Sequence, residues 1–130
     1  MFKRVDHVEL VTANPDRMVR FYTEVLGFAL RRRDRISSTP LGPLDLVYLD
    51  LGGTTVELMT YPEATPDSAP SGEHLGYRMI ALEVDDMDDA LHFLKSKGIE
   101  ASWGPVKRPT YARAEIRDPD GNAIELRKWL

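Results

Sequence analysis

The feature that most constrains the fold is an internal repeat. Residues 5 to 27, "VDHVELVTANPDRMVRFYTEVLG", are similar to residues 77 to 98, "YRMIALEVDDMDDALHFLKSKG". A second match joins "GTTVEL" at 53 to 58 with "GNAIEL" at 121 to 126. Because similarity at two spaced places indicates a repeated structural unit, the chain is predicted to contain two copies of one unit.

Each copy is predicted to begin with a strand followed by a helix. Residues 4 to 12 alternate as a strand does, and Asn14 is then the expected N-cap with Pro15 at the first helical position. The first helix is expected to end at Gly27. In the second copy Asp86 is the expected cap and Gly98 the end of the helix. The order of elements is therefore the same in both halves.

Three more strands are predicted after each helix. They cover 28 to 36, 44 to 51 and 54 to 60 in the first half, and 99 to 103, 111 to 117 and 122 to 128 in the second. The predicted fold class is α+β, with paired βαβββ modules that form a cupped, incompletely closed mixed sheet. The modules are expected at 1 to 60 and 77 to 130, within one structural domain. The segment 61 to 76 contains three prolines and is expected to be the linker.

Composition narrows the function. The chain has 130 residues, a net charge of −4 and no cysteine. This size is typical of one domain, and the net charge disfavours a nucleic-acid surface. Without cysteine, a metal must be held by histidine, carboxylate or water. No apolar run reaches the roughly 18 residues that a membrane span needs, and no signal peptide is evident, so we expect no membrane partner and a cytoplasmic location.

Strand alternation predicts that four side chains face away from the helices. Apolar neighbours on either side of each position are expected to be buried, which leaves the opposite face to His7, Glu57, Met79 and Glu125. Imidazole and carboxylate suit a divalent metal, namely Ni²⁺, Co²⁺, Zn²⁺, Mn²⁺ or Fe²⁺. The alternative is that the histidine and the two glutamates are ordinary solvent-facing residues of a half-exposed sheet.

Four segments together resemble the vicinal oxygen chelate superfamily of glyoxalases, bleomycin resistance proteins and dioxygenases. These segments are "DHVELVTANPDRMVRFYTEVLGF", "GGTTVELM", "MIALEVDDMDDALHFLKSKGI" and "EIRDPDGNAIEL". The resemblance implies the paired βαβββ fold, usually as a homodimer. It also implies a divalent metal bound at the first and last strands of each half.

The resemblance carries three metal ligands onto this chain. His7, Glu57 and Glu125 match ligand positions of the glyoxalase I pattern, whereas Met79 stands at a fourth position where that pattern has histidine. It further implies that Glu125 or Glu57 moves the proton beside the substrate carbonyl, through an enediolate-type intermediate. A thioether is a weak donor for these metals, so Met79 predicts weakened metal binding. His74 replaces the missing ligand only if its loop folds back.

The implied function is a glyoxalase-like metal-dependent lyase or isomerase acting on a small oxygen-chelating carbonyl substrate. Alternatives are a metal-free binding or resistance protein in which Met79 forms an apolar wall, and a scaffold with a vestigial site. A dioxygenase is disfavoured because Met79 removes the second histidine of its iron triad. The candidates for substrate contacts are Arg113, Tyr48, Trp103 and Tyr111. The cup is expected either within one chain or between two chains of a dimer.

Overall fold

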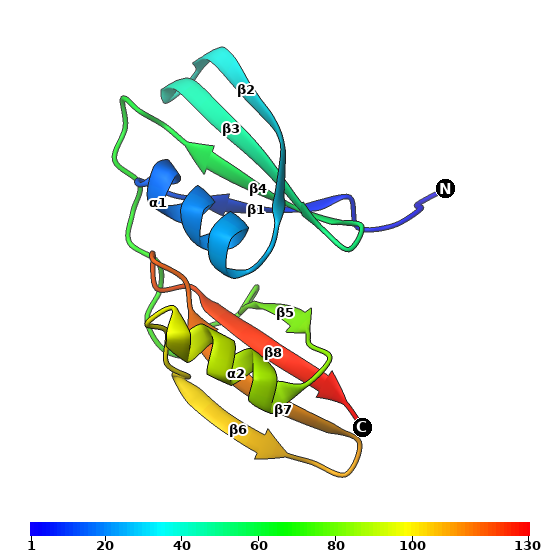
Figure 1. The fold of residues 1–130 in the computed structure, drawn as a ribbon. Helices are drawn as coiled ribbons and strands as arrows, with labels where there is room; N and C mark the ends of the chain where they lie inside the picture. The colour runs from blue at the N-terminus through cyan, green and yellow to red at the C-terminus, as the bar shows by residue number, and fades with distance from the viewer. The chain divides into compact units, whose positions relative to one another are not determined.

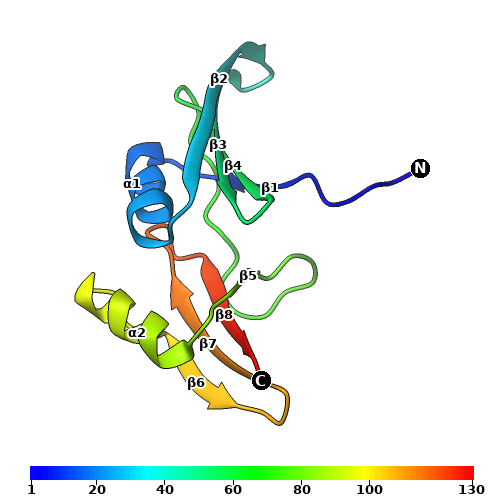
Figure 2. The same cartoon turned by 45° about the vertical axis from the view of Figure 1, so that its right-hand side comes forward.

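The computed structural model describes residues 1–130 and separates them into two compact units, Met1–Ala69 and Pro70–Leu130. Each unit contains one four-stranded mixed sheet, and neither sheet closes into a barrel (Figure 1). Within each unit the helical segment lies across one face of its sheet, as Figure 2 also shows. The predicted α+β fold is therefore confirmed.

The first unit contains β1 (His7–Val11), α1 (Pro15–Arg20), β2 (Ala29–Thr39), β3 (Gly42–Leu51) and β4 (Thr54–Thr60). Its strand order is β1-β4-β3-β2, with β1 parallel to β4 and the other pairs antiparallel. As predicted, Asn14 caps α1: its side chain accepts a hydrogen bond from the Arg17 amide. The helix does not continue unchanged, because Phe21–Val25 forms a π-helical turn in which the Leu26 amide donates to the Phe21 carbonyl.

The second unit contains β5 (Ile80–Glu83), α2 (Met87–Ser96), β6 (Trp103–Lys107), β7 (Tyr111–Arg117) and β8 (Ala123–Trp129). Its order is β5-β8-β7-β6, the same connectivity as in the first unit. Asp86 caps α2 as predicted. The strand expected at 99 to 103 is wrong in position, since β6 begins where that prediction ends.

The position of β6 has a local explanation. The segment contains Gly104 and Pro105, which weaken a strand interior and are typical of edge strands, and β6 is an edge strand. Gly104 has φ +76°, and a Cβ there would lie 2.9 Å from the Arg113 carbonyl oxygen. Only glycine fits this close approach between β6 and β7.

Each unit has its own apolar core on the helix side of the sheet. In the first unit β3 and β4 contribute Leu49, Val56 and Leu58, which pack with Met18 and Tyr22 of the helical segment and are all at most 2% exposed. In the second, β7 and β8 contribute Ala114, Ile116, Ile124 and Leu126, which are equally buried. Alternation along these strands leaves the intervening side chains on the other face, where the candidate site lies. Neither unit contains a helix long and apolar enough to span a bilayer.

Candidate functional site

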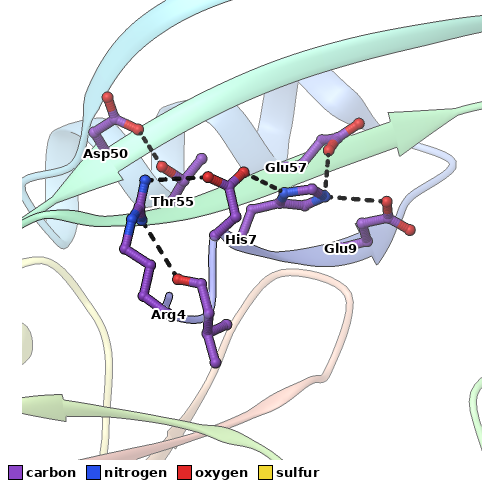
Figure 3. Close-up of polar contacts among 8 residues, drawn as sticks. Arg4, His7, Glu9, Asp50, Thr55 and Glu57 are labelled. Atoms are coloured by element: carbon purple, nitrogen blue, oxygen red, sulfur yellow. Dashed lines mark hydrogen bonds and ion pairs between the residues drawn. The ribbon is translucent and has the colours of Figure 1, made fainter. Parts of the chain in front are cut away.

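His7 and Glu57 come together on the open face of the first sheet. Glu57 lies in the centre of β4, and the parallel register places Glu9 directly beside it on β1. His7 is two residues before Glu9 and so projects from the same face. The His7 Nε2 atom lies 3.0 Å from Glu57 Oε2 and 3.2 Å from Glu9 Oε1 (Figure 3).

A second carboxylate orients the histidine. His7 Nδ1 is 2.9 Å from Asp6 Oδ2, and Asp6 in turn pairs with Arg4 at 3.1 Å. When Nδ1 is protonated and donates a hydrogen bond to Asp6, the Nε2 lone pair faces Glu9 and Glu57. A carboxylate behind the imidazole is the usual arrangement at protein metal sites, because it fixes the tautomer and the ring orientation.

The electrostatics of this group favour a cation between the carboxylates. Burial raises the pKa of Glu57, which is only 5% exposed, and the neighbouring Glu9 charge acts in the same direction, while His7 opposes both. The hydrogen bond with Asp6, followed by that with Glu9, raises the pKa of His7 above its ordinary 6.5. The same carboxylates that favour a proton on His7 would also favour a bound cation.

His7, Glu9 and Glu57 fit a divalent metal. One ligand atom from each lies within 4.8 Å of the others, and the set supplies one imidazole nitrogen and two carboxylate oxygens. Three protein ligands leave coordination positions open, as a catalytic site requires. Glu9 was not among the ligands predicted from the sequence. The available signal was its spacing of two residues from His7 on one strand, which puts both side chains on the same face.

Glu125 has different neighbours. It lies on the open face of the second sheet, as alternation predicted, but its Oε1 accepts a hydrogen bond of 2.6 Å from Arg127 Nε. Arg113 Nε lies 3.3 Å from the same oxygen. Two guanidinium groups therefore already compensate the charge of Glu125, whereas Glu57 faces an imidazole.

Met79 contributes no donor comparable to His7. It precedes the first residue of β5, and its sulfur lies 3.9 Å from Arg78 Nη1. His74, the other candidate for the fourth position, lies in the loop before it. Its Nδ1 atom lies 3.3 Å from the Gly72 carbonyl oxygen, and its Nε2 atom lies 3.0 Å from the Tyr77 carbonyl oxygen.

The residues proposed to contact substrate fall on both sheets. Tyr48 is paired with Glu57 in the β3–β4 register, and the Arg31 guanidinium lies 5.2 Å from the centre of its ring. Trp103, Tyr111 and Arg113 all belong to the second unit, where Arg113 lies 4.8 Å from the centre of the Trp103 ring. Two further residues on this second face, Arg127 and Trp129, were not singled out from the sequence. They follow Glu125 at spacings of two residues along β8.

Comparison with known proteins gives one consistent family. The model of the glyoxalase/bleomycin resistance protein/dioxygenase superfamily matches residues 4–126. A protein of Vibrio cholerae named probable lactoylglutathione lyase is 31% identical over 125 residues, covering 95% of this chain and 88% of that protein. The lactoylglutathione lyase of Neisseria meningitidis serogroup A is 34% identical over 127 residues, with 95% and 88% covered.

Solved structures agree with this match. The crystal structure of a glyoxalase family protein from Bacillus cereus has a TM-score of 0.83 and 26% sequence identity, covering 100% of this chain and 96% of that one. The similarity therefore extends over both units and the segment that connects them.

Proposed function

Because the chain belongs to the glyoxalase/bleomycin resistance protein/dioxygenase superfamily, we propose that it is a metal-dependent lyase or isomerase acting on a small oxygen-chelating carbonyl substrate. The observation that carries the proposal is the group of His7, Glu9 and Glu57, a buried carboxylate beside an imidazole and a second carboxylate. Relatives named lactoylglutathione lyase support the same reaction class.

In this proposal His7, Glu9 and Glu57 hold the metal. A divalent cation at such a site supplies Lewis-acid polarisation of a carbonyl oxygen. Asp6 keeps the His7 ring turned with Nε2 toward the carboxylates. Glu57 is also the proposed proton acceptor, because a carboxylate held at the metal can take up the proton beside the polarised carbonyl with little motion.

From the family pattern, Glu125 is the proposed alternative to Glu9 as the third ligand, and also a proposed proton-transfer group. For either role its carboxylate must leave Arg127 and Arg113, which now lie at 2.6 and 3.3 Å. That requirement favours a second candidate function, a metal-free small-molecule binding or resistance protein. Met79 at the other ligand position of the second half supports the same alternative.

The reaction is tested by exchange of the proton next to a carbonyl. Metal-stripped protein, alone and reloaded with Ni²⁺, Co²⁺, Zn²⁺ or Mn²⁺, is incubated in deuterated water with α-hydroxycarbonyl compounds, acyl thioesters and the glutathione adduct of an α-oxoaldehyde. We expect NMR to show exchange or turnover that requires metal and is lost in Glu57→Gln. Exchange independent of metal and of Glu57 would contradict the mechanism. Absence of exchange with every substrate would favour the metal-free alternative.

Metal affinity is expected to depend on pH through His7. Only the neutral imidazole binds a metal, and the hydrogen bonds to Asp6 and Glu9 raise the pKa of His7 above 6.5. Affinity is thus highest above that raised pKa and falls as the pH drops through it, by about tenfold per pH unit once His7 is mostly protonated. Calorimetric titrations at several pH values between 6 and 9 check this, and a flat profile would argue against His7 as a ligand.

We also propose that the protein acts in the cytoplasm as a homodimer. Each sheet has two edge strands, β1 and β2 in the first unit and β5 and β6 in the second. A second copy of the chain can cover such edges. Sedimentation equilibrium measures the oligomeric state directly. A mass of twice 14.7 kDa is expected, and a monomer at micromolar concentration would contradict the dimer.

A further inference from the structure

The open faces of the two sheets carry different chemistry at matching positions of the repeat. Where the first unit has His7 and Glu9, the second has Met79 and Ala81. On the neighbouring strands it is the second unit that carries the charged residues. The pair Leu46 and Met59 in the β3–β4 register corresponds to the pair Arg113 and Arg127 in the β7–β8 register. The second sheet therefore has two arginines where the first has Leu46 and Met59, and it has no counterpart of the pair His7 and Glu9.

Buried carboxylates hold these arginines in place. Arg113 Nη2 donates to Glu115 Oε2 at 2.8 Å, and Arg127 Nε donates to Glu125 Oε1 at 2.6 Å. The side chains of Glu115 and Glu125 are only 9% and 11% exposed, whereas those of Arg113 and Arg127 are 19% and 24% exposed. In each pair the arginine side chain is therefore the more accessible partner.

Aromatic rings complete the surface. The Arg127 guanidinium lies 4.0 Å from the centre of the Tyr111 ring and 4.9 Å from that of Trp129, and Arg113 lies 4.8 Å from that of Trp103. Such contacts fix the orientation of the guanidinium planes. Trp103 and Trp129 are nevertheless 41% and 52% exposed, so parts of both indoles are available to a ligand. We call Trp103, Tyr111, Arg113, Arg127 and Trp129 the arginine–aromatic face.

The ion pairs on this face balance in charge. Arg78 Nη2 lies 3.8 Å from Glu115 Oε2 and equally far from Glu73 Oε1, so three arginines face three carboxylates. Each guanidinium carries five N–H donors, so the hydrogen bonds to Glu115 and Glu125 leave donors of Arg113 and Arg127 for a ligand.

We propose that the arginine–aromatic face binds a small organic oxyanion. Its carboxylate or phosphate accepts hydrogen bonds from the exposed N–H groups of Arg113 and Arg127, and its apolar part packs on Trp103 or Trp129. Guanidinium suits both anions because its planar donors match their oxygens. In this role Glu115 and Glu125 are positioning residues for the arginines. The inference rests on the second unit alone and requires no metal.

Intrinsic fluorescence provides the test, because Trp103 and Trp129 are the only tryptophans of the chain. The probes are benzoate, phenyl phosphate and inorganic phosphate, added to metal-stripped protein in EDTA, with benzamide as the neutral analogue of benzoate. We expect a saturable fluorescence change, confirmed by calorimetry, with benzoate or phenyl phosphate, and binding of benzamide weaker by about 10-fold or more. Preference between the two anions identifies the headgroup, and binding of inorganic phosphate alone shows whether the ring is needed.

Two variants make the test specific. Arg127→Gln is expected to weaken anion binding by about 10-fold or more, and Arg113→Lys keeps the charge but loses the planar fork, so it is expected to weaken binding less. Arg33→Gln, on exposed strand β2 of the first unit, is the matched control and should bind as wild type does. Circular dichroism confirms that each variant is folded.

Three outcomes would overturn the proposal. They are equal binding of benzoate and benzamide, an equal loss of binding in Arg33→Gln, and no saturable response to any anion. Since EDTA is present throughout, that failure is distinct from failure of the metal site.

Discussion

Replacement of Glu57 by glutamine is expected to reduce metal affinity by at least about 100-fold, more than loss of an outer-shell partner usually does. The amide has nearly the same shape as the carboxylate but no charge, and Glu57 is the most buried of the three ligand candidates. The fold should tolerate the change, because glutamine also removes the need to bury an ionised group whose pKa burial raises. Isothermal titration of metal-stripped protein with Ni²⁺, Co²⁺, Zn²⁺ and Mn²⁺ measures the loss.

The matched control for this variant is Glu24→Gln. Glu24 is an exposed residue of the π-helical turn and is not one of the candidate metal ligands. Its replacement therefore makes the same chemical change away from the site. It should bind metal as the wild type does. Retention of wild-type affinity in Glu57→Gln, or equal losses in both variants, would show that Glu57 is not a ligand.

Replacement of the adjacent Leu58 by alanine is expected to lower the stability of the fold and to leave the metal affinity almost unchanged. Leu58 is 1% exposed and faces the helix side of the sheet, where truncation of a leucine typically lowers the free energy of unfolding by about 2–5 kcal/mol. Urea denaturation of the metal-free protein measures this. The folded fraction should still bind metal with nearly wild-type affinity, since Leu58 and Glu57 project from opposite faces of β4.

An exposed position on the neighbouring strand controls for strand substitution in general. Val11 on β1 is 48% exposed, and Val11→Ala should change stability by no more than about 0.5 kcal/mol. If Leu58→Ala left stability unchanged, or lowered metal affinity as strongly as Glu57→Gln, the assignment of the two faces of β4 would be wrong.

Much of the fold follows from the sequence because its signals are local. The repeat, the caps at Asn14 and Asp86 and the alternation along β4 and β8 each depend on residues close together in the chain. The same alternation placed His7 and Glu57 on one face, and the 3.0 Å contact between them agrees with it. The π-helical turn at Phe21–Val25 has no comparable signal, because the residues there have ordinary helical spacing.

The partners across strands could not be read from alternation. Alternation determines the face on which a residue lies, but not its neighbour, which depends on the register between strands. Glu9 is a ligand candidate because the parallel register sets it beside Glu57, and Glu125 meets Arg113 because β7 and β8 pair as they do. The family pattern includes Glu125 and omits Glu9 for a related reason: it specifies ligand positions and not the charges that surround them.

The most direct test of the metal site compares two glutamates in one experiment. Metal-stripped wild type, Glu9→Gln and Glu125→Gln are titrated calorimetrically with Co²⁺ and Zn²⁺ at pH 8, above the ordinary pKa of histidine. We predict that wild type and Glu125→Gln bind one metal per chain with similar affinity, whereas Glu9→Gln binds at least about tenfold more weakly. Loss of binding in Glu125→Gln with Glu9→Gln unaffected would place the ligands across both units, and absence of binding to wild type would contradict the metal site altogether.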